Sequence, residues 1–211
     1  PDGSTRTADF RGHDGFRRGP ETVTTWSGGV LWDEETFRVR CAVLDHKIPC
    51  LGFALEEKLH INIWKSGLER LGLPVGPWLR ELKAAVARGE PDETVIPVGP
   101  AGVLLGTLRT EALRLVPGQK ITYVTDVVYH PENAAAILEL AQGADWLFLE
   151  ATFARDEEAR AAEKYHLTTA QAGRLAREAG ARRLVPFHFS PKYADEGDRL
   201  AQEAQAAFEG L

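Results

Sequence analysis

The hydrophobic and polar positions predict strands in the first part of the chain and alternating strands and helices after residue 120. Short runs of β-branched and apolar residues separated by turn residues predict strands over 30–32, 37–44, 50–55, 121–125, 146–149 and 184–189. Apolar residues spaced three and four apart predict helices over about 132–142, 155–164, from 169 to Gly180, and 197–208. This order predicts an α/β fold in which helices stack on one face of a sheet.

Two segments depart from this pattern. The first twenty residues contain four Gly and two Pro without a period, which predicts a loop or a frayed end over 1–22. Residues 64–88 have a helical pattern that Gly and Pro interrupt at 71–77, which predicts two short helices. Met is absent from the sequence, so we expect residue 1 to be a trimmed end or the edge of a longer chain.

Composition narrows the class of protein. The chain has 211 residues and a formal net charge of −6, and no apolar stretch approaches the roughly 18 residues of a membrane helix. Cys41 and Cys50 are too few for a disulfide framework, and no apolar secretory signal is present at the front. We therefore expect a cytoplasmic protein whose two cysteines are small buried side chains.

Charge is unevenly distributed along the sequence. Residues 58–88 contain six basic and two acidic side chains in a chain that is acidic as a whole. This excess is compatible with a solvated helical face and with contacts to an anionic partner.

Candidate metal ligands follow the predicted strands. His46 and Asp126 each come just after a strand, and His188 ends another. Ligands at the carboxyl ends of neighbouring strands converge on one edge of a sheet. Imidazole with carboxylate suits Zn²⁺, or less selectively Mn²⁺ or Fe²⁺. His166 lies between two predicted helices, where it is either a neighbour of a helix cap or a proton donor.

Four segments, in this order, resemble the ribonuclease Z family of the metallo-β-lactamase superfamily, in its C-terminal two-thirds. The segments are VRCAVLDHKIPCLGF, LGLPVGPWLRELKAAVARGE, VTDVVYHPENAAAILELAQGADWLFLEATFA and KYHLTTAQAGRLAREAGARRLVPFHFSPKY. The resemblance implies a metallo-β-lactamase-type αββα sandwich, of which this chain carries the C-terminal portion. It also implies a zinc-dependent endoribonuclease that removes the 3′ trailers of precursor transfer RNA, with two metal ions per site.

The resemblance also assigns roles to individual residues. His46, Asp126 and His188 match metal ligands, and Asp126 matches the aspartate that bridges two zinc ions. His166 matches the histidine thought to protonate the leaving 3′ oxygen. Glu150 matches the glutamate that supports that histidine.

The resemblance divides residues 23–211 into two parts. Residues 23–57 and 89–211 correspond to the metallo-β-lactamase-type domain, and residues 58–88 to an inserted helical arm that grips the transfer RNA. The arm's RNA-binding candidates are Lys58, Lys65, Arg70, Gly76, Pro77, Arg80 and Lys83.

The sequence departs from the family's pattern at several positions. Leu149 stands where the family has a histidine, Leu167 where it has a serine, and Lys192 where an arginine is usual. The family's His-x-His-x-Asp-His loop is absent, so the printed chain carries only part of the implied ligand set.

Three interpretations stay open. The chain is part of a ribonuclease-Z-like hydrolase, a degenerate metal-poor homologue with a binding or scaffold role, or a superfamily phosphodiesterase acting on small substrates. Half a sandwich would expose an apolar sheet face, so we also expect a partner segment or a homodimer.

Overall fold

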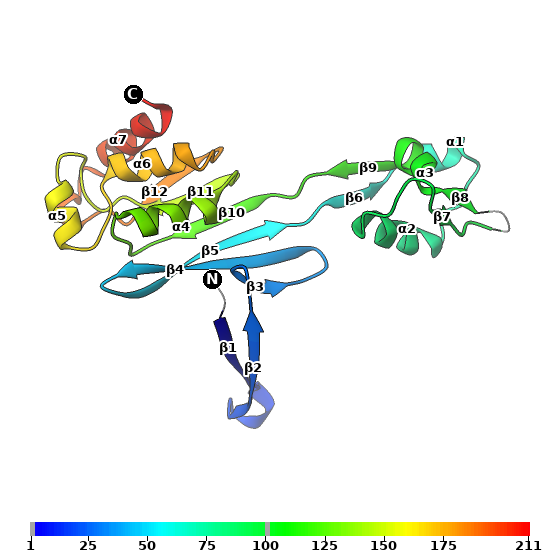
Figure 1. Ribbon diagram of the computed structural model, residues 1–211, viewed down its shortest axis with the longest axis horizontal. Helices are drawn as coiled ribbons and strands as arrows, with labels where there is room; N and C mark the ends of the chain where they lie inside the picture. Colours follow the sequence, from blue (N-terminus) through cyan, green and yellow to red (C-terminus); the bar gives the residue numbers. More distant parts are fainter. Residues whose placement is uncertain (1–2, 100–101) are drawn as a thin grey trace. The chain divides into compact units, whose positions relative to one another are not determined.

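The computed structural model describes residues 3–99 and 102–211, and the chain divides into two compact units (Figure 1). The larger unit comprises Pro1–Glu56 and Gln119–Leu211, and the smaller unit comprises Glu57–Gly118. The range 58–88, expected to be an inserted arm, lies inside the smaller unit, which continues for a further thirty residues.

A six-stranded sheet organises the larger unit. Its order is β12-β11-β10-β5-β4-β3, with β10, β11 and β12 parallel and with β10 antiparallel to β5. The predicted strands are confirmed, with small shifts at their ends: β3 (Val30–Asp33), β4 (Phe37–His46), β5 (Ile48–Glu57), β10 (Lys120–Val124), β11 (Trp146–Glu150) and β12 (Leu184–Phe187).

Helices pack against one side of this sheet, as predicted: α4 (Pro131–Ala141), α6 (Thr169–Glu178) and α7 (Gly197–Glu209). The short helix α5 (Glu158–Glu163) instead buries Ala161 in a separate cluster with Phe153, Tyr193 and Leu200. Helix α4 contacts β4 and β10, helix α6 contacts β11 and β12, and α7 packs on α6 (Figure 1). Local signals fix the helix ends, because Pro131 occupies the first turn of α4 and Thr168 forms a capping box with Gln171 at α6. Within residues 3–99 and 102–211, no helix has the length and apolarity needed to cross a membrane.

The two faces of the sheet differ in burial. Alternate residues such as Leu44, Val124, Leu147 and Leu149 are buried against the helices. Their neighbours in sequence point to the opposite face, because strand side chains alternate. The apolar sheet face comprises Val43, Leu51, Phe53, Leu55, Ile121 and Tyr123, each between 37% and 50% exposed. The αββα sandwich has two sheet-and-helix layers, and the described residues form one of them with an apolar face left open.

The N-terminal region is a hairpin, so the prediction of a loop over 1–22 was wrong for its described residues. Strand β1 (Gly3–Phe10) pairs antiparallel with β2 (Arg18–Trp26), and a short 3₁₀ turn (Gly12–Asp14) lies between them. Most of these residues are exposed on both sides of the hairpin. No alternation of apolar and polar residues therefore marks the strands, and backbone pairing defines them instead.

The smaller unit has its own core. Its elements are β6 (His60–Ile63), α1 (Lys65–Arg70), α2 (Trp78–Ala87), β7 (Val95–Ile96), β8 (Val103–Leu104), α3 (Leu105–Ala112) and β9 (Leu113–Val116). The break predicted at 71–77 is confirmed, because α1 ends before it and α2 begins after it. Leu82, Leu105 and Leu108 are fully buried in this core. Gly67 allows α1 to approach α3, since a Cβ atom there would lie 1.8 Å from the Glu111 carbonyl oxygen.

Candidate metal centre

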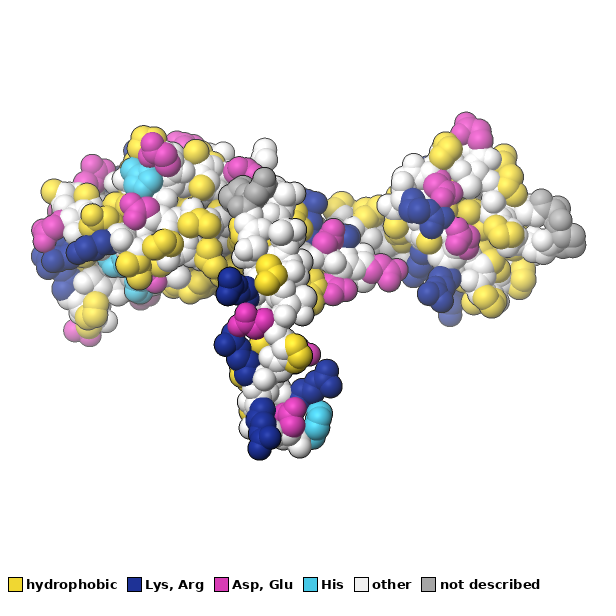
Figure 2. All heavy atoms as spheres, turned by 60° about the horizontal axis from the view of Figure 1, so that its bottom comes forward, with side chains coloured by type: hydrophobic (Ala, Val, Ile, Leu, Met, Phe, Trp, Pro, Cys, Tyr) yellow, Lys and Arg dark blue, Asp and Glu magenta, His cyan; other side chains and the backbone are white. Residues whose placement is uncertain are grey.

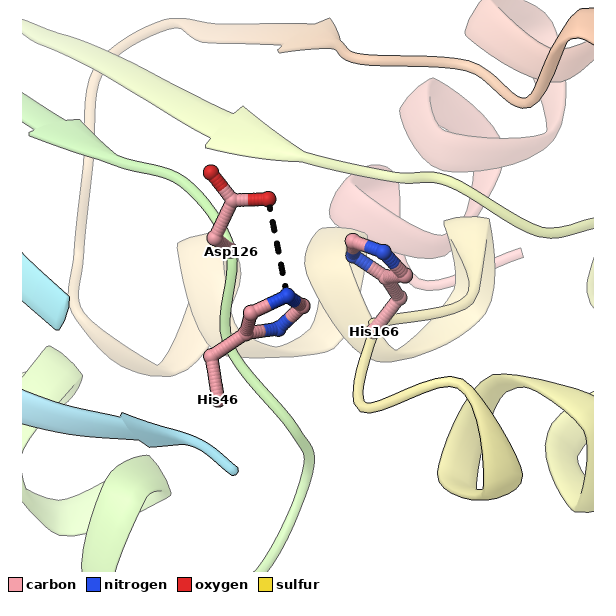
Figure 3. Close-up of side chains that lie close together, drawn as sticks. All are labelled: His46, Asp126 and His166. Atoms are coloured by element: carbon pink, nitrogen blue, oxygen red, sulfur yellow. Dashed lines mark ion pairs between the residues drawn. The ribbon is translucent and has the colours of Figure 1, made fainter. Parts of the chain in front are cut away.

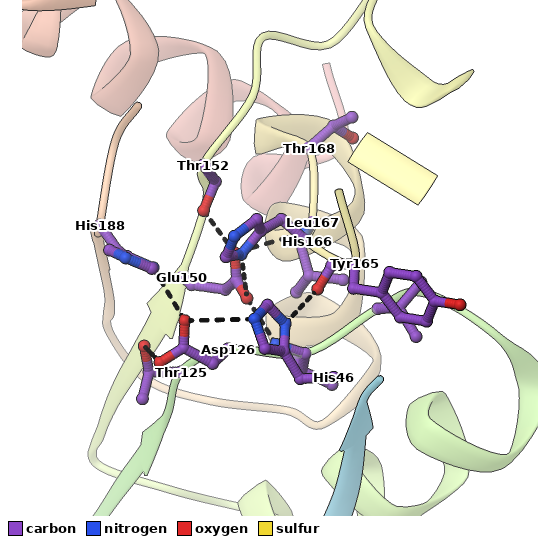
Figure 4. Close-up of polar contacts among 12 residues, drawn as sticks. His46, Thr125, Asp126, Glu150, Thr152, Tyr165, His166, Leu167, Thr168 and His188 are labelled. Carbon is purple, nitrogen blue, oxygen red and sulfur yellow. Dashed lines mark hydrogen bonds and ion pairs between the residues drawn. The ribbon is translucent and has the colours of Figure 1, made fainter. Parts of the chain in front are cut away.

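The ends of four strands supply the side chains of the candidate site. His46 is the last residue of β4, Glu150 is the last of β11, and His188 directly follows β12. Asp126 lies two residues after the end of β10. The structure brings these four side chains together with His166, which lies between α5 and α6 (Figures 3 and 4).

Asp126 lies between two imidazoles. Its Oδ1 atom is 3.8 Å from His46 Nε2 and 3.8 Å from His188 Nδ1 (Figure 4). Two ligand atoms that share a zinc ion, each about 2.0–2.2 Å from it, lie roughly 3–4 Å apart. The distance from each imidazole nitrogen to the Asp126 carboxylate is therefore short enough for both groups to bind the same cation.

The backbone orients the His46 ring. Its Nδ1 atom lies 2.6 Å from the carbonyl oxygen of Tyr165, so the Nδ1–H group donates to that oxygen. This hydrogen bond assigns the tautomer and leaves the Nε2 lone pair facing Asp126. Metal-bound histidines are held in the same way in many proteins, with the second ring nitrogen bonded to a carbonyl or carboxylate.

Glu150 is a buried carboxylate that accepts hydrogen bonds from four groups. Oε1 accepts from the backbone N–H of Val127 at 2.6 Å, and Oε2 accepts from the Leu167 N–H at 3.3 Å and from the Thr152 hydroxyl. The Nδ1–H of His166 completes the set, 3.0 Å from Oε2. Glu150 is fully buried, and these bonds compensate for the loss of its hydration.

His166 lies beside the candidate ligands. Its ring centroid is 4.7 Å from that of His46 and 5.3 Å from that of His188. Burial alone would lower the pKa of His166, but its hydrogen bond to Glu150 and the charges of Glu150 and Asp126 outweigh it. The net effect raises the pKa of His166 and favours the protonated ring.

Among the described residues, two overlapping groups of three could hold a metal ion. One is His46, Asp126 and His166, and the other is Glu150, His166 and His188. Within each group the ligand atoms lie within 4.8 Å of one another. Nitrogen and carboxylate donors of this kind fit zinc, so these residues suit the zinc ions that the resemblance implied. Which residues ligate and which transfer protons stays a prediction.

Asn133 is a buried side chain near the site that the sequence analysis missed. Its Oδ1 accepts from the Asp45 N–H at 3.0 Å, and its Nδ2 donates to the carbonyls of Asp45 at 3.0 Å and Val128 at 2.8 Å. These bonds join the end of the strand carrying His46 to the loop carrying Asp126. An Asn in the first turn of a helix is ordinary in sequence, so only the tertiary contact reveals its role.

The predicted RNA-binding residues all lie in the smaller unit. That unit contains eight basic and seven acidic side chains. The positive charge of residues 58–88 is therefore almost cancelled by acidic side chains in the rest of the unit. Arg70 forms a salt bridge with Glu111 at 3.3 Å. Lys65, Arg80 and Lys83 form no salt bridge with any residue in the described ranges, which leaves their charges available to a partner.

Comparisons with known proteins found related sequences. A family profile described as "Beta-lactamase superfamily domain" matches residues 101–189. Ribonuclease Z of Deinococcus radiodurans is 35% identical over 98% of this chain and 61% of its own length. Ribonuclease Z of Bacteroides fragilis is 39% identical over 85% of this chain and 54% of its own length. The chain thus spans about half to three-fifths of the length of these relatives.

Solved structures that are similar include the short form of human tRNase Z, with 23% identity and a TM-score of 0.45 over 78% of this chain and 41% of that one. A metallo-beta-lactamase fold protein from Bacillus subtilis has 16% identity and a TM-score of 0.46, covering 83% of this chain and 45% of its own. By the profile and the sequence relatives, this chain is similar to the beta-lactamase superfamily over residues 101–189, and over most of its own length to proteins named Ribonuclease Z.

Proposed function

We propose that the chain forms part of a metal-dependent phosphodiester hydrolase that removes the 3′ trailers of precursor transfer RNA. One observation carries the proposal. Asp126 lies 3.8 Å from both His46 and His188, and a histidine bonded to a buried glutamate lies beside them. The names of the sequence relatives, Ribonuclease Z, support the nuclease class and this substrate.

His46, Asp126 and His188 would hold the metal, with two zinc ions per site expected and manganese or iron as alternatives. When bound, such ions activate a water molecule and neutralise charge on the phosphate oxygens. The chain's own contribution is orientation. The Tyr165 carbonyl holds the His46 ring, and Thr125 Oγ1 lies 3.4 Å from Oδ2 of Asp126, on the side of the carboxylate away from His46.

His166 would act as the proton donor. Its Nδ1–H is bonded to Glu150, so the opposite ring nitrogen, Nε2, is the one that can face a substrate. The raised pKa of this ring favours its protonated form, as a proton donor requires. His166 would give that proton to the 3′ oxygen that leaves when the phosphodiester bond breaks.

The partners follow from the same proposal. Precursor transfer RNA would contact Lys65, Arg80 and Lys83 of the smaller unit through its phosphates, with an affinity that falls as salt rises. A second copy of the chain would cover the apolar sheet face in a homodimer. The openness of that face supports this expectation, since soluble proteins rarely expose large contiguous apolar patches.

The first test is zinc binding by the full chain, measured by isothermal titration calorimetry. The second is cleavage of precursor transfer RNA and of a small phosphodiester. His46→Ala should weaken zinc binding strongly, because it removes a ligand whose orientation is fixed. His60→Ala is the matched control, since this histidine lies in the smaller unit.

Each outcome discriminates between the interpretations. Equal zinc affinity of the wild type and His46→Ala would refute the metal centre and favour a binding or scaffold protein. Cleavage of the small ester without cleavage of transfer RNA would favour a phosphodiesterase for small substrates.

A further inference from the structure

A cavity of about 470 Å³ lies next to the candidate metal centre. His166 and His188 form part of its lining, together with Phe153 and Phe189. Arg160 and Lys164 of the α5 region also line it. Two aromatic rings and two cations therefore surround a space that borders the proposed reacting groups.

The Arg160 guanidinium is held at this cavity by weak contacts. Its Cζ atom is 5.8 Å from the centroid of the Phe153 ring, a cation–π arrangement with a buried aromatic. Its nearest acidic group is Glu157, at 3.9 Å. Glu157 already accepts hydrogen bonds from Lys192 and from the Tyr193 hydroxyl. The donors of Arg160 are therefore only partly used, and its side chain is 53% exposed.

Lys164 provides a second cation on the same lining. Its ammonium group is 3.1 Å from Glu163, but both side chains are more than half exposed. An exposed pair of this kind contributes little energy, because water screens it and the side chains stay mobile. Lys164 can therefore exchange this partner for another anion at little cost.

We propose that Arg160 and Lys164 form a phosphate-binding subsite in this cavity for a single-stranded polynucleotide. The subsite would hold the phosphate of the nucleotide adjacent to the bond that is cleaved, and so align the strand past His166. Arg presents a planar fork of donors that matches phosphate, and Lys adds a compact charge. This inference rests on the proposed function, since it assumes that a phosphodiester strand enters the site.

The experiment is fluorescence anisotropy of a labelled trinucleotide of RNA with the full chain, in EDTA so that no cleavage occurs. Arg160→Gln, Lys164→Gln and the double variant are compared with the wild type over a series of salt concentrations. Arg155→Gln is the matched control, because Arg155 is an exposed neighbour outside the cavity lining. Circular dichroism checks that each variant is folded.

We expect the double variant to bind about tenfold more weakly, the order expected when one strong charge-assisted contact is lost. The slope of log affinity against log salt should fall by about 0.7, which corresponds to one phosphate contact of a single strand. Each single variant should have a smaller effect in the same direction, and Arg155→Gln should match the wild type.

Two results would overturn the inference. One is a double variant whose affinity and salt slope equal those of Arg155→Gln. The other is inorganic phosphate competing as tightly as the trinucleotide, which would indicate a simple anion site. Failure of the proposed function is distinguishable, because binding that depends on Arg160 and Lys164 without metal-dependent cleavage would leave the subsite standing.

Discussion

Glu150→Gln separates the structural and the electrostatic roles of the buried carboxylate. The substitution keeps the shape of the side chain but replaces one acceptor oxygen with an amide donor. Oε2 faces three donors and Oε1 faces the Val127 N–H. The amide oxygen should therefore take the place of Oε2, which leaves the amide nitrogen pointing at the Val127 N–H.

The expected cost follows from that arrangement. One buried donor loses its acceptor, which costs about 1–3 kcal/mol of unfolding free energy. A second effect concerns His166, whose raised pKa depends on the Glu150 charge and should fall in the variant. A raised pKa stabilises the fold below the unfolded-state value of about 6.5, and this contribution disappears as pH rises through the folded-state pKa. The loss of stability should thus be larger near pH 5 than near pH 8.

Urea unfolding of metal-free protein at both pH values measures the loss, and NMR titration of the His166 ring measures the pKa. Glu163→Gln is the matched control, because the Glu163 side chain is 70% exposed. A Glu150→Gln protein with wild-type stability at both pH values, and with an unchanged His166 pKa, would refute the proposed role of this carboxylate.

Three further predictions concern other parts of the larger unit. Burial alone would raise the pKa of Glu56, but hydrogen bonds from Lys120 and Arg38 lower it. Glu56→Gln should therefore reduce the free energy of unfolding by about 1–3 kcal/mol at neutral pH. Unfolding curves measured in acid should show that this difference vanishes as pH falls through the Glu56 pKa, below about 4.3. Asn133→Ala should weaken zinc binding, measured by calorimetry, because it releases two loops of the site; unchanged affinity would contradict this. Phe53→Lys should shift a homodimer toward monomer in sedimentation velocity, whereas an unaltered dimer would place the interface elsewhere.

The sequence predicted the sheet and its helices well because each has a local signal. Burial on one side produces the alternation in the strands, and Pro131 and Gly180 mark helix ends. The same logic singled out the candidate metal ligands, since side chains that directly follow neighbouring strands converge on one edge of a sheet. His46, Asp126 and His188 were placed by position alone, and the structure brings them together.

Other features have no local signal. The hairpin of β1 and β2 is exposed on both sides, so its sequence carries no period that distinguishes strand from loop. The smaller unit extends to Gly118 because α3 and β9 complete a core begun by α2, and that contact is between residues distant in sequence. The Asn133 and Tyr165 contacts at the site are likewise tertiary, and no residue spacing reveals them.

The backbone itself supports the assignment of the site. Four residues other than glycine with a positive φ angle lie at it: Lys47 at 65°, Asp126 at 51°, Tyr165 at 61° and His188 at 63°. Each such residue costs about 1–3 kcal/mol, and strain of this kind persists only where the surrounding structure fixes it. Two of the four are proposed ligands, and the other two adjoin His46 and His166. Three of these residues follow the strands β4, β10 and β12, and Tyr165 lies between α5 and α6. Left-handed backbone at four positions that carry or adjoin the proposed side chains therefore supports the prediction that these side chains act together.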